Sequence, residues 1–413
     1  LLLQERVPKA IAPLYPNELE MVGRHKSLFE KSDASLRILN NPNTPAPEVH
    51  LLSNGRYHVM ITNGGGGYSR WKELFVTRWR EDPTRDSWGS FCFIRDLTSG
   101  EVWSTAYQPT LKTSKLYEAI FSQGRAEFRR RHENLDTHTE ITVSPEDDIE
   151  LRRITMTNRS RQARRIELTS YAEVVIAAGA ADSAHPAFSN LFVETEIRRE
   201  RHAILCTRRP RSPGEKPPYL IHLMLVQGAT EGETSFETDR SKFIGRGQTI
   251  STPLAFENVL PLSNSEGSVL DPIVSIRRVI TLEADESVRI ELISGMAETK
   301  EAALSLIEKY QDSHLAERVI ELAWTHSQVV LRHLNASESD AQLYGRLAGA
   351  LLYASPLRRE HAATLLKNNR GQNTLWSYGI SGDWPMVLLY ITNPTTMADW
   401  VRQLVQAHAY WRM

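Results

Sequence analysis

The hydrophobic pattern of the chain changes from a period of two to a helical period near residue 297. Between about residues 50 and 296, short segments alternate apolar and polar side chains, as in Val59/Ile61, Phe91/Phe93, Ile166/Leu168, Val274/Ile276 and Val288/Ile290/Leu292. A period of two sends successive side chains to opposite faces of a strand. Turn signals separate the segments, among them Ser53-Asn54-Gly55, Thr98-Ser99-Gly100 and Glu231-Gly232. About a dozen such strands without intervening helices predict a large antiparallel β-sandwich.

Four segments after this β block repeat apolar residues at helical spacing. They are Glu298–Gln311, Leu315–Leu334, Asp340–Tyr353 and Met397–Trp411. A β block followed by a helical block is typical of two domains joined by helices. The sequence therefore predicts a β + α multidomain protein.

Composition and charge exclude several classes of protein. Of the 413 residues, 41% are hydrophobic and 24% are charged, as in ordinary globular proteins and unlike disordered chains. The formal net charge of −1 provides no overall field that would attract nucleic acid or an anionic membrane. We therefore interpret the arginine-rich stretches Arg129–Arg131 and Arg161–Arg165 as solvated strand ends. The longest apolar run, Val174–Ala181, is far shorter than the ~20 residues that span a bilayer.

The two ends of the chain predict that it is part of a longer polypeptide. It opens with Leu1-Leu2-Leu3-Gln4-Glu5-Arg6, without an initiator Met or the layout of a signal peptide. It stops at Met413, directly after the helix-like run Trp400–Trp411, whereas domains tend to end in surface linkers. We therefore expect part of any active site to lie outside this sequence.

The densest glycine run, here called the glycine tract, is Asn63–Ser69. Glycine permits positive φ and a close approach of the backbone to a ligand. A phosphate-binding loop would need a Gly-Lys-[Ser/Thr] ending and a following helix, but Arg70-Trp71-Lys72 and a predicted strand follow instead. A ligand-contacting loop and a flexible hairpin loop are the two alternatives.

Five aromatic residues lie close together after the glycine tract, and they are Trp71, Trp79, Trp88, Trp103 and Tyr107. Flat aromatic faces near Asp and Arg suit a sugar, whose C–H groups stack while its hydroxyls take polar partners. The same residues in the core of a sandwich would look no different. Both interpretations stay open at this point.

A second cluster, Gln372–Pro385, combines two glycines, two Trp and one acid between predicted helices, which is typical of a site loop. Other kinds of site lack their motifs, since there is no His-Glu-x-x-His, no Gly-x-Ser-x-Gly and no spacing that pairs two acids as glycosidase carboxylates. Cys92 and Cys206 are too few for a disulfide framework or a four-cysteine zinc site. We expect both to be buried and inert.

Several segments resemble motifs of glycoside hydrolase family 94, in particular the phosphorylase-like region of cyclic β-1,2-glucan synthases. They are Gly65–Trp71, Thr77–Asp86, Gly100–Ser104, His185–Ser189 and Leu375–Asp383. Cellobiose and chitobiose phosphorylases belong to the same family, and the resemblance extends over essentially the whole chain. It implies a large antiparallel β super-sandwich, a helical linker and an (α/α)6 catalytic barrel, of which this chain would hold the first helices. The expected divisions are a connector over 1–45, a carbohydrate-binding super-sandwich over 46–297, the linker over 298–355 and the start of the barrel over 356–413.

The resemblance also implies a reaction, inverting phosphorolysis. Inorganic phosphate attacks the anomeric carbon while an Asp protonates the leaving glycosidic oxygen. Phosphate is thus a co-substrate, and no other cofactor and no metal is expected. The general-acid Asp is expected beyond Met413, so no catalytic residue is assigned, and this chain alone is expected to be inactive.

The resemblance assigns substrate-binding roles to residues in two loops. They are Trp376, Tyr378, Ser381 and Asp383 in the expected donor-sugar loop, and Tyr68 and Arg70 in the glycine-rich loop that would reach the mouth of the active site. Asp383 has an alternative structural role as the N-cap of a helix that Pro385 would begin.

The expected partners are a β-glucan oligosaccharide, the remaining domains of the parent polypeptide and, in a homodimer, a second copy of the chain, but no nucleic acid. The implied location is the cytoplasmic face of a larger inner-membrane protein, with no transmembrane segment in this chain. A second hypothesis is a non-catalytic carbohydrate-binding or interaction module, which the sandwich alone would fit. A third, a hydrolase complete in this chain, requires a carboxylate pair that converges in one cleft.

Overall fold

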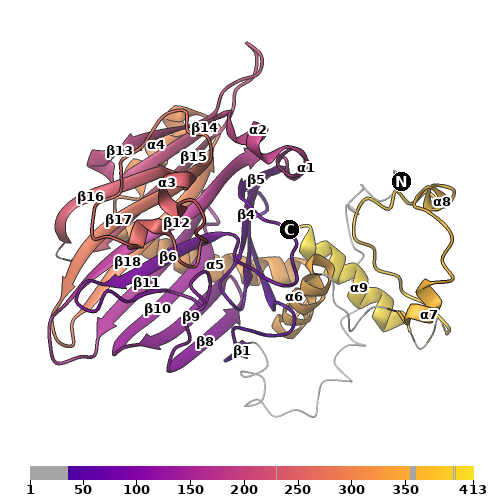
Figure 1. Cartoon of the computed structure of the whole chain (residues 1–413). Coiled ribbons are helices and arrows are strands. Elements are labelled where there is room, and N and C mark those ends of the chain that lie inside the picture. The colour runs from indigo at the N-terminus through magenta and orange to yellow at the C-terminus, as the bar shows by residue number, and fades with distance from the viewer. Residues whose placement is uncertain (1–35, 229, 354–359, 394, 396) are drawn as a thin grey trace.

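The computed structural model describes residues 36–228, 230–353, 360–393, 395 and 397–413. Two antiparallel sheets form a β-sandwich, and helices follow it in the chain (Figure 1). The predicted fold class is therefore confirmed. The first sheet has the order β1 (Arg37–Leu39), β8 (Leu116–Ser122), β9 (Arg125–His132), β10 (Leu135–Val143), β11 (Ile149–Asn158), β18 (Ser287–Ala297), β15 (Tyr219–Gln227), β14 (Ala203–Arg208) and β13 (Val193–Arg198).

The second sheet is organised around one long strand, β12 (Arg164–Ala177). On one side of β12 lie β17 (Pro272–Leu282) and then β16 (Thr230–Asp239). On its other side, β6 (Ser90–Asp96) pairs with the first part of β12 and also with β7 (Val102–Ser104). The end of β12 pairs with the first of four further strands, which are β5 (Leu74–Thr77), β4 (Gly67–Trp71), β3 (Tyr57–Thr62) and β2 (Val49–Ser53).

Apolar side chains from both sheets meet in one central core, as the period of two predicts. Val59 and Ile61 of β3 lie in this core together with Ile166 and Leu168 of β12. The alternate side chains of some strands point away from it. Ile221 on β15, for example, lies in a second cluster on the outer face of the first sheet.

The long helices form at the predicted positions, and all of them except α9 begin with a side-chain cap. The Thr299 side chain accepts a hydrogen bond from Ala302 N, and Asp312 accepts one from His314 N. These helices are α4 (Lys300–Lys309), α5 (Ser313–His333), α6 (Glu338–Leu352) and α9 (Ala398–Trp411), with the short helices α7 (Ala362–Leu365) and α8 (Asn373–Trp376) before α9.

Helices α4 and α5 cover the outer face of the first sheet, where Ile307 and Val319 join Ile221 in the second cluster. Helix α6 packs at the edge of the sandwich instead. Arg37 Nε of β1 donates to Gln342 Oε1 of α6 at 2.7 Å, and Gln342 Nε2 donates to Phe121 O of β8 at 3.0 Å. The helices therefore contact the sandwich on two different sides.

Three details differ from the sequence predictions. The β block was expected to lack helices, but it contains α1 (Gly179–Ala184), α2 (Pro186–Asn190) and α3 (Arg240–Ile244). Glu231-Gly232 was predicted as a turn, yet it lies inside β16, where the register with β17 shifts and Gly232 has φ +67°. Within the expected connector, β1 is formed, whereas residues 1–35 lie outside the described residues.

Arg130 was predicted at a solvated strand end, but its side chain is buried in β9. Its Nη1 donates to Ser104 O at 2.9 Å, and its Nη2 donates to Lys112 O at 2.7 Å. Burial lowers the pKa of Arg130 to about 10. Its neighbours Arg129 and Arg131 are exposed, because they point to the opposite face of the strand.

The glycine tract forms the hairpin between β3 and β4 and is buried rather than loose. A Cβ atom on Gly66 would lie 1.8 Å from the carbonyl oxygen of Asp86. The Asp86 carboxylate in turn accepts hydrogen bonds from Thr62 Oγ1 and Gln108 Nε2. Burial raises the pKa of Asp86. The interpretation as a flexible loop is therefore wrong, since the glycines let two backbone segments touch.

A buried charge network joins the end of β12 to the short helices α1 and α2. Arg78 Nη1 lies 2.6 Å from Glu173 Oε2, and its Nη2 donates to Asn190 Oδ1 at 2.7 Å. Arg240 Nε reaches the other Glu173 oxygen at 2.7 Å. Burial acts to lower the pKa of Arg78, but the carboxylates of Glu173, Asp182 and Asp271 outweigh it and raise that pKa.

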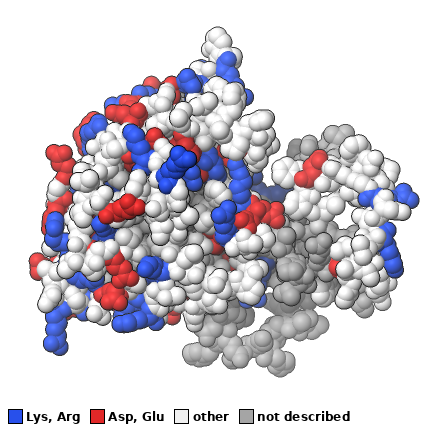
Figure 2. Space-filling model, viewed as in Figure 1, with Lys and Arg blue, Asp and Glu red and all other residues white. Residues whose placement is uncertain are grey.

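On the face shown in Figure 2, acidic and basic side chains are intermixed over the sandwich. Within the described part of the chain, none of the helices combines the length and the hydropathy of a bilayer span.

Replacement of Arg78 by Met should destabilise the sandwich strongly. The change leaves Glu173 and Asp182 buried with one cation fewer, which costs ~3–5 kcal/mol in comparable buried pairs. Urea denaturation followed by circular dichroism measures the free energy of unfolding. Arg85→Met is the matched control, because Arg85 pairs with Asp82 at the surface and its loss should leave the free energy of unfolding nearly unchanged. Equal losses in the two variants would contradict the assigned role of the network.

Replacement of Gly66 by Ala should lower the free energy of unfolding by ~1–3 kcal/mol, because the new Cβ overlaps the Asp86 carbonyl. Gly214→Ala serves as the control, since no heavy atom lies within 4 Å of a Cβ built there. Thermal melts of both variants decide the point. A Gly66→Ala protein as stable as the wild type would show that the hairpin is loose after all.

Candidate functional site

The predicted donor-sugar loop is closed by the side chain of Gln372, which directly precedes α8. Gln372 Nε2 donates to Asp383 Oδ1 at 2.7 Å and to Ser381 O at 2.8 Å. Trp376 Nε1 donates to the same Ser381 carbonyl at 3.2 Å. Three of the predicted residues, Trp376, Ser381 and Asp383, are therefore held together. Sequence analysis placed Gln372 in this cluster but gave it no role. The signal that could have identified it is the presence of an amide side chain and a carboxylate in the same short loop.

The aromatic side chains of this loop point into solvent. The exposed fraction is 63% for Trp376, 78% for Tyr378 and 80% for Trp384. Aromatic rings of this size are usually buried, so an exposed group of them next to a carboxylate marks a candidate binding surface.

Asp383 is not a helix cap in this structure. The described residues that follow it, up to Asn393, contain no helix that its carboxylate could cap. Its Oδ1 instead accepts the hydrogen bond from Gln372. The alternative structural role is therefore wrong, and the carboxylate fastens the loop.

Tyr68 lies on β4 and packs into an aromatic group on the outer face of the second sheet. Its ring centroid is 5.4 Å from those of Phe75 and Trp79. Trp79 makes an edge contact with Tyr353 at 5.9 Å, just after α6. Burial raises the pKa of the Tyr68 hydroxyl. In this structure the ring of Tyr68 packs with protein side chains.

Arg70 lies two residues further along β4, close to the surface. Its Nη2 forms an ion pair with Glu73 Oε2 at 2.9 Å, and its Nε donates to Lys72 O. Among the described residues, no hydrogen bond or ion pair links Tyr68 or Arg70 to the loop of Gln372 and Asp383. Hydrogen bonds thus join residues of the predicted donor-sugar loop to one another, but none of those described connects Tyr68 or Arg70 to that loop.

The five clustered aromatic residues fall into different environments. Trp71 and Trp103 lie in the central core, as the structural interpretation required, and Trp71 Nε1 donates to Asp148 Oδ2 at 2.7 Å. Trp79 belongs to the aromatic group around Tyr68. Trp88 and Tyr107 are half-buried, and Tyr107 lines a surface groove. Most of this cluster is therefore structural.

The described residues form no site for metal binding or for thiol chemistry. These residues contain no group of three or more His, Cys, Asp or Glu side chains that could hold a metal ion. Cys92 and Cys206 are buried as predicted, and burial raises the pKa of the Cys92 thiol to about 12. Neither sulfur is therefore a ready nucleophile.

Comparison with known proteins gives several related sequences. Over 412 residues the chain is 35% identical to the cyclic β-(1,2)-glucan synthase NdvB of Rhizobium meliloti (strain 1021), an alignment that covers 100% of this chain and 14% of that protein. It is 24% identical to N,N'-diacetylchitobiose phosphorylase of Vibrio proteolyticus, over 67% of this chain and 34% of the enzyme. It is 23% identical to solabiose phosphorylase of Paenibacillus borealis, over 66% of this chain and 35% of the enzyme. The chain thus spans about a third or less of the length of these relatives.

A family model covers most of the chain. Residues 33–313 match the supersandwich domain of glycosyl hydrolase 94. The matched span contains both sheets of the sandwich and helix α4. The chain therefore belongs to glycosyl hydrolase family 94.

Proposed function

We propose that this chain is the carbohydrate-binding part of a phosphorylase-like module of a cyclic β-1,2-glucan synthase. In the complete module, inorganic phosphate would cleave β-1,2-glucan by inverting phosphorolysis and so control chain length. The proposal includes the remaining domains of such a synthase as partners and the cytoplasmic face of the inner membrane as location. Support comes from similarity over the whole chain to a protein named as a glucan synthase, and over about two thirds of it to proteins named as phosphorylases.

The observation that carries this proposal is the closed loop with its exposed aromatic rings. Trp376 and Tyr378 offer flat apolar faces to the C–H groups of a glucosyl unit. Gln372 occupies Asp383 Oδ1, and among the described residues Oδ2 receives no hydrogen bond. That oxygen is therefore available to accept a hydrogen bond from a sugar hydroxyl.

Phosphate enters this proposal as the nucleophile, which removes the need for a base that activates water. The residues assigned here bind and orient the glucan, and none of them is assigned a proton transfer. Inorganic phosphate is the co-substrate, and the proposed reaction uses no cofactor.

The catalytic part of the proposal is tested with a parent polypeptide that contains this region. Sophoro-oligosaccharides and inorganic phosphate are supplied, and glucose 1-phosphate is measured. Release of β- or α-glucose 1-phosphate identifies a phosphorylase, and the α-anomer identifies inversion. Binding of the glucan without release would reject phosphorolysis and leave the non-catalytic binding module.

Trp376→Ala should weaken the binding of sophoro-oligosaccharides to this chain by about tenfold, the effect of losing ~1.4 kcal/mol of stacking. Isothermal titration calorimetry measures the dissociation constant. Trp324→Ala is the matched control, because Trp324 on α5 is also exposed, at 60%, and lies outside the loop. An equal loss in both variants, or in neither, would argue against a sugar site at Trp376.

Asp383→Asn should weaken the same binding by about ten- to hundredfold, since a charge-assisted hydrogen bond contributes ~1.5–3 kcal/mol. Asn keeps an oxygen that can accept the bond from Gln372, so the melting temperature should change little. Asp399→Asn on α9 removes an exposed carboxylate elsewhere and serves as the control. A lower melting temperature with unchanged affinity would reduce Asp383 to a structural role.

A further inference from the structure

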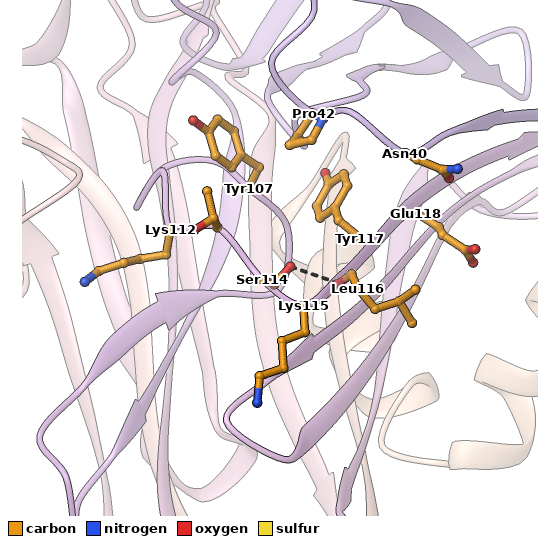
Figure 3. A pocket seen from close by; sticks show the side chains of 10 residues that line it. Asn40, Pro42, Tyr107, Lys112, Ser114, Lys115, Leu116, Tyr117 and Glu118 are labelled. Carbon is orange, nitrogen blue, oxygen red and sulfur yellow. Dashed lines mark hydrogen bonds between the residues drawn. The ribbon is translucent and has the colours of Figure 1, made fainter.

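A groove of about 350 Å³ opens on the surface of the sandwich, away from the residues assigned above (Figure 3). Asn40 and Pro42, which lie between β1 and β2, form one part of its wall. Tyr107 and the segment 112–118, which leads into β8, form the rest. A volume of this size is within the range of small-ligand sites, ~300–1,000 Å³.

Buried polar side chains fix the walls of this groove. Arg130 holds the backbone around Tyr107 through its bonds to Ser104 O and Lys112 O. Asn63 of the glycine tract donates from Nδ2 to Asn41 O at 2.9 Å, which fixes the opposite wall. Tyr117 connects the two, because its hydroxyl donates to Asn63 O at 2.7 Å. The groove is therefore preformed, and a ligand would pay little ordering entropy there.

The lining combines apolar faces with uncommitted polar groups. Figure 3 shows Lys112, Lys115 and Glu118 extending away from Pro42 and the rings of Tyr107 and Tyr117, each in a different direction. Among the described residues, the side chains of Lys112, Lys115 and Glu118 make no hydrogen bond or ion pair. Donors and an acceptor are thus available on different sides of the apolar wall. This mixture of donors, an acceptor and apolar faces suits a polyhydroxy ligand, whose hydroxyls donate and accept hydrogen bonds and whose C–H groups pack on aromatic rings.

We propose that this groove is a second glucan-binding site, separate from the loop of Trp376 and Asp383. One glucosyl unit packs its C–H face on Tyr107 and Pro42, and hydroxyls of neighbouring units of the same glucan bond to Lys112, Lys115 and Glu118. The choice of β-1,2-glucan as ligand rests on the proposed function, whereas the groove itself does not. Two sites on one chain increase the effective concentration of a long glucan at each of them.

Lysine footprinting tests the groove directly. The whole chain is acetylated with and without sophoro-oligosaccharides, and the modification of each lysine is measured by mass spectrometry. Glucan should slow the acetylation of Lys112 and Lys115 severalfold and leave Lys216, on the exposed hairpin between β14 and β15, unchanged. Glucan binding by calorimetry without protection of Lys112 and Lys115 would overturn the proposal.

Variants separate the two sites. Tyr107→Ala should abolish the protection of Lys112 and Lys115 and leave the quenching of tryptophan fluorescence by glucan intact. Trp376→Ala should abolish the quenching of tryptophan fluorescence and leave the protection of Lys112 and Lys115 intact. Lys115→Gln, an exposed change that cannot unfold the core, should weaken groove binding about tenfold, while Lys216→Gln has no effect.

The outcomes distinguish this proposal from the proposed function. Protection of the groove lysines without any effect of Trp376→Ala would retain the groove and reject the loop site. Loss of fluorescence quenching in Trp376→Ala without protection of the groove lysines would retain the loop and reject the groove. Protection by an acidic peptide but not by glucan would identify a protein-docking surface and overturn the assignment.

Discussion

The second sheet depends on β12, because this 14-residue strand pairs with three others. Strand β17 lies along one side of it, and β6 and β5 follow one another along the other side. The end of β12 also carries Glu173, whose carboxylate forms ion pairs with both Arg78 and Arg240. Backbone pairing and buried charge therefore converge on one strand. Through them, β2–β5 and the short helices α1 and α2 are fixed to the rest of the sandwich.

The strands and long helices were predictable because their signals are local. Val288, Ile290 and Leu292 alternate within β18, and the segment predicted from Leu315 to Leu334 became α5 with ends shifted by at most two residues. Arg130 was misjudged because its partners Ser104 and Lys112 lie 26 and 18 residues away. No local pattern shows that such an arginine points inward, and overall neutrality of the chain gave no help.

The candidate site shows the same limit. Composition identified the loop after residue 371, and the hydrogen bond that closes it spans only 11 residues. The surroundings of Tyr68 were not predictable, because Trp79 contacts Tyr353 across 274 residues. The groove was missed for a related reason. Its walls come from the segments before β2 and before β8, and the arginine that holds one of them had been placed in solvent.

Helix α6 touches both layers of the sandwich at once. Gln342 bonds to Arg37 on β1 and to the backbone of β8 in the first sheet, while Leu352 at the end of α6 and the adjoining Tyr353 pack with Val49 and Met60 of the second sheet. Sliding one sheet over the other would therefore break the docking of this helix, and release of the helix would expose the sandwich edge. Opening of the edge and undocking of α6 become a single cooperative event. In amide hydrogen exchange, the helix and the edge strands should then share one opening free energy, although they belong to different parts of the chain.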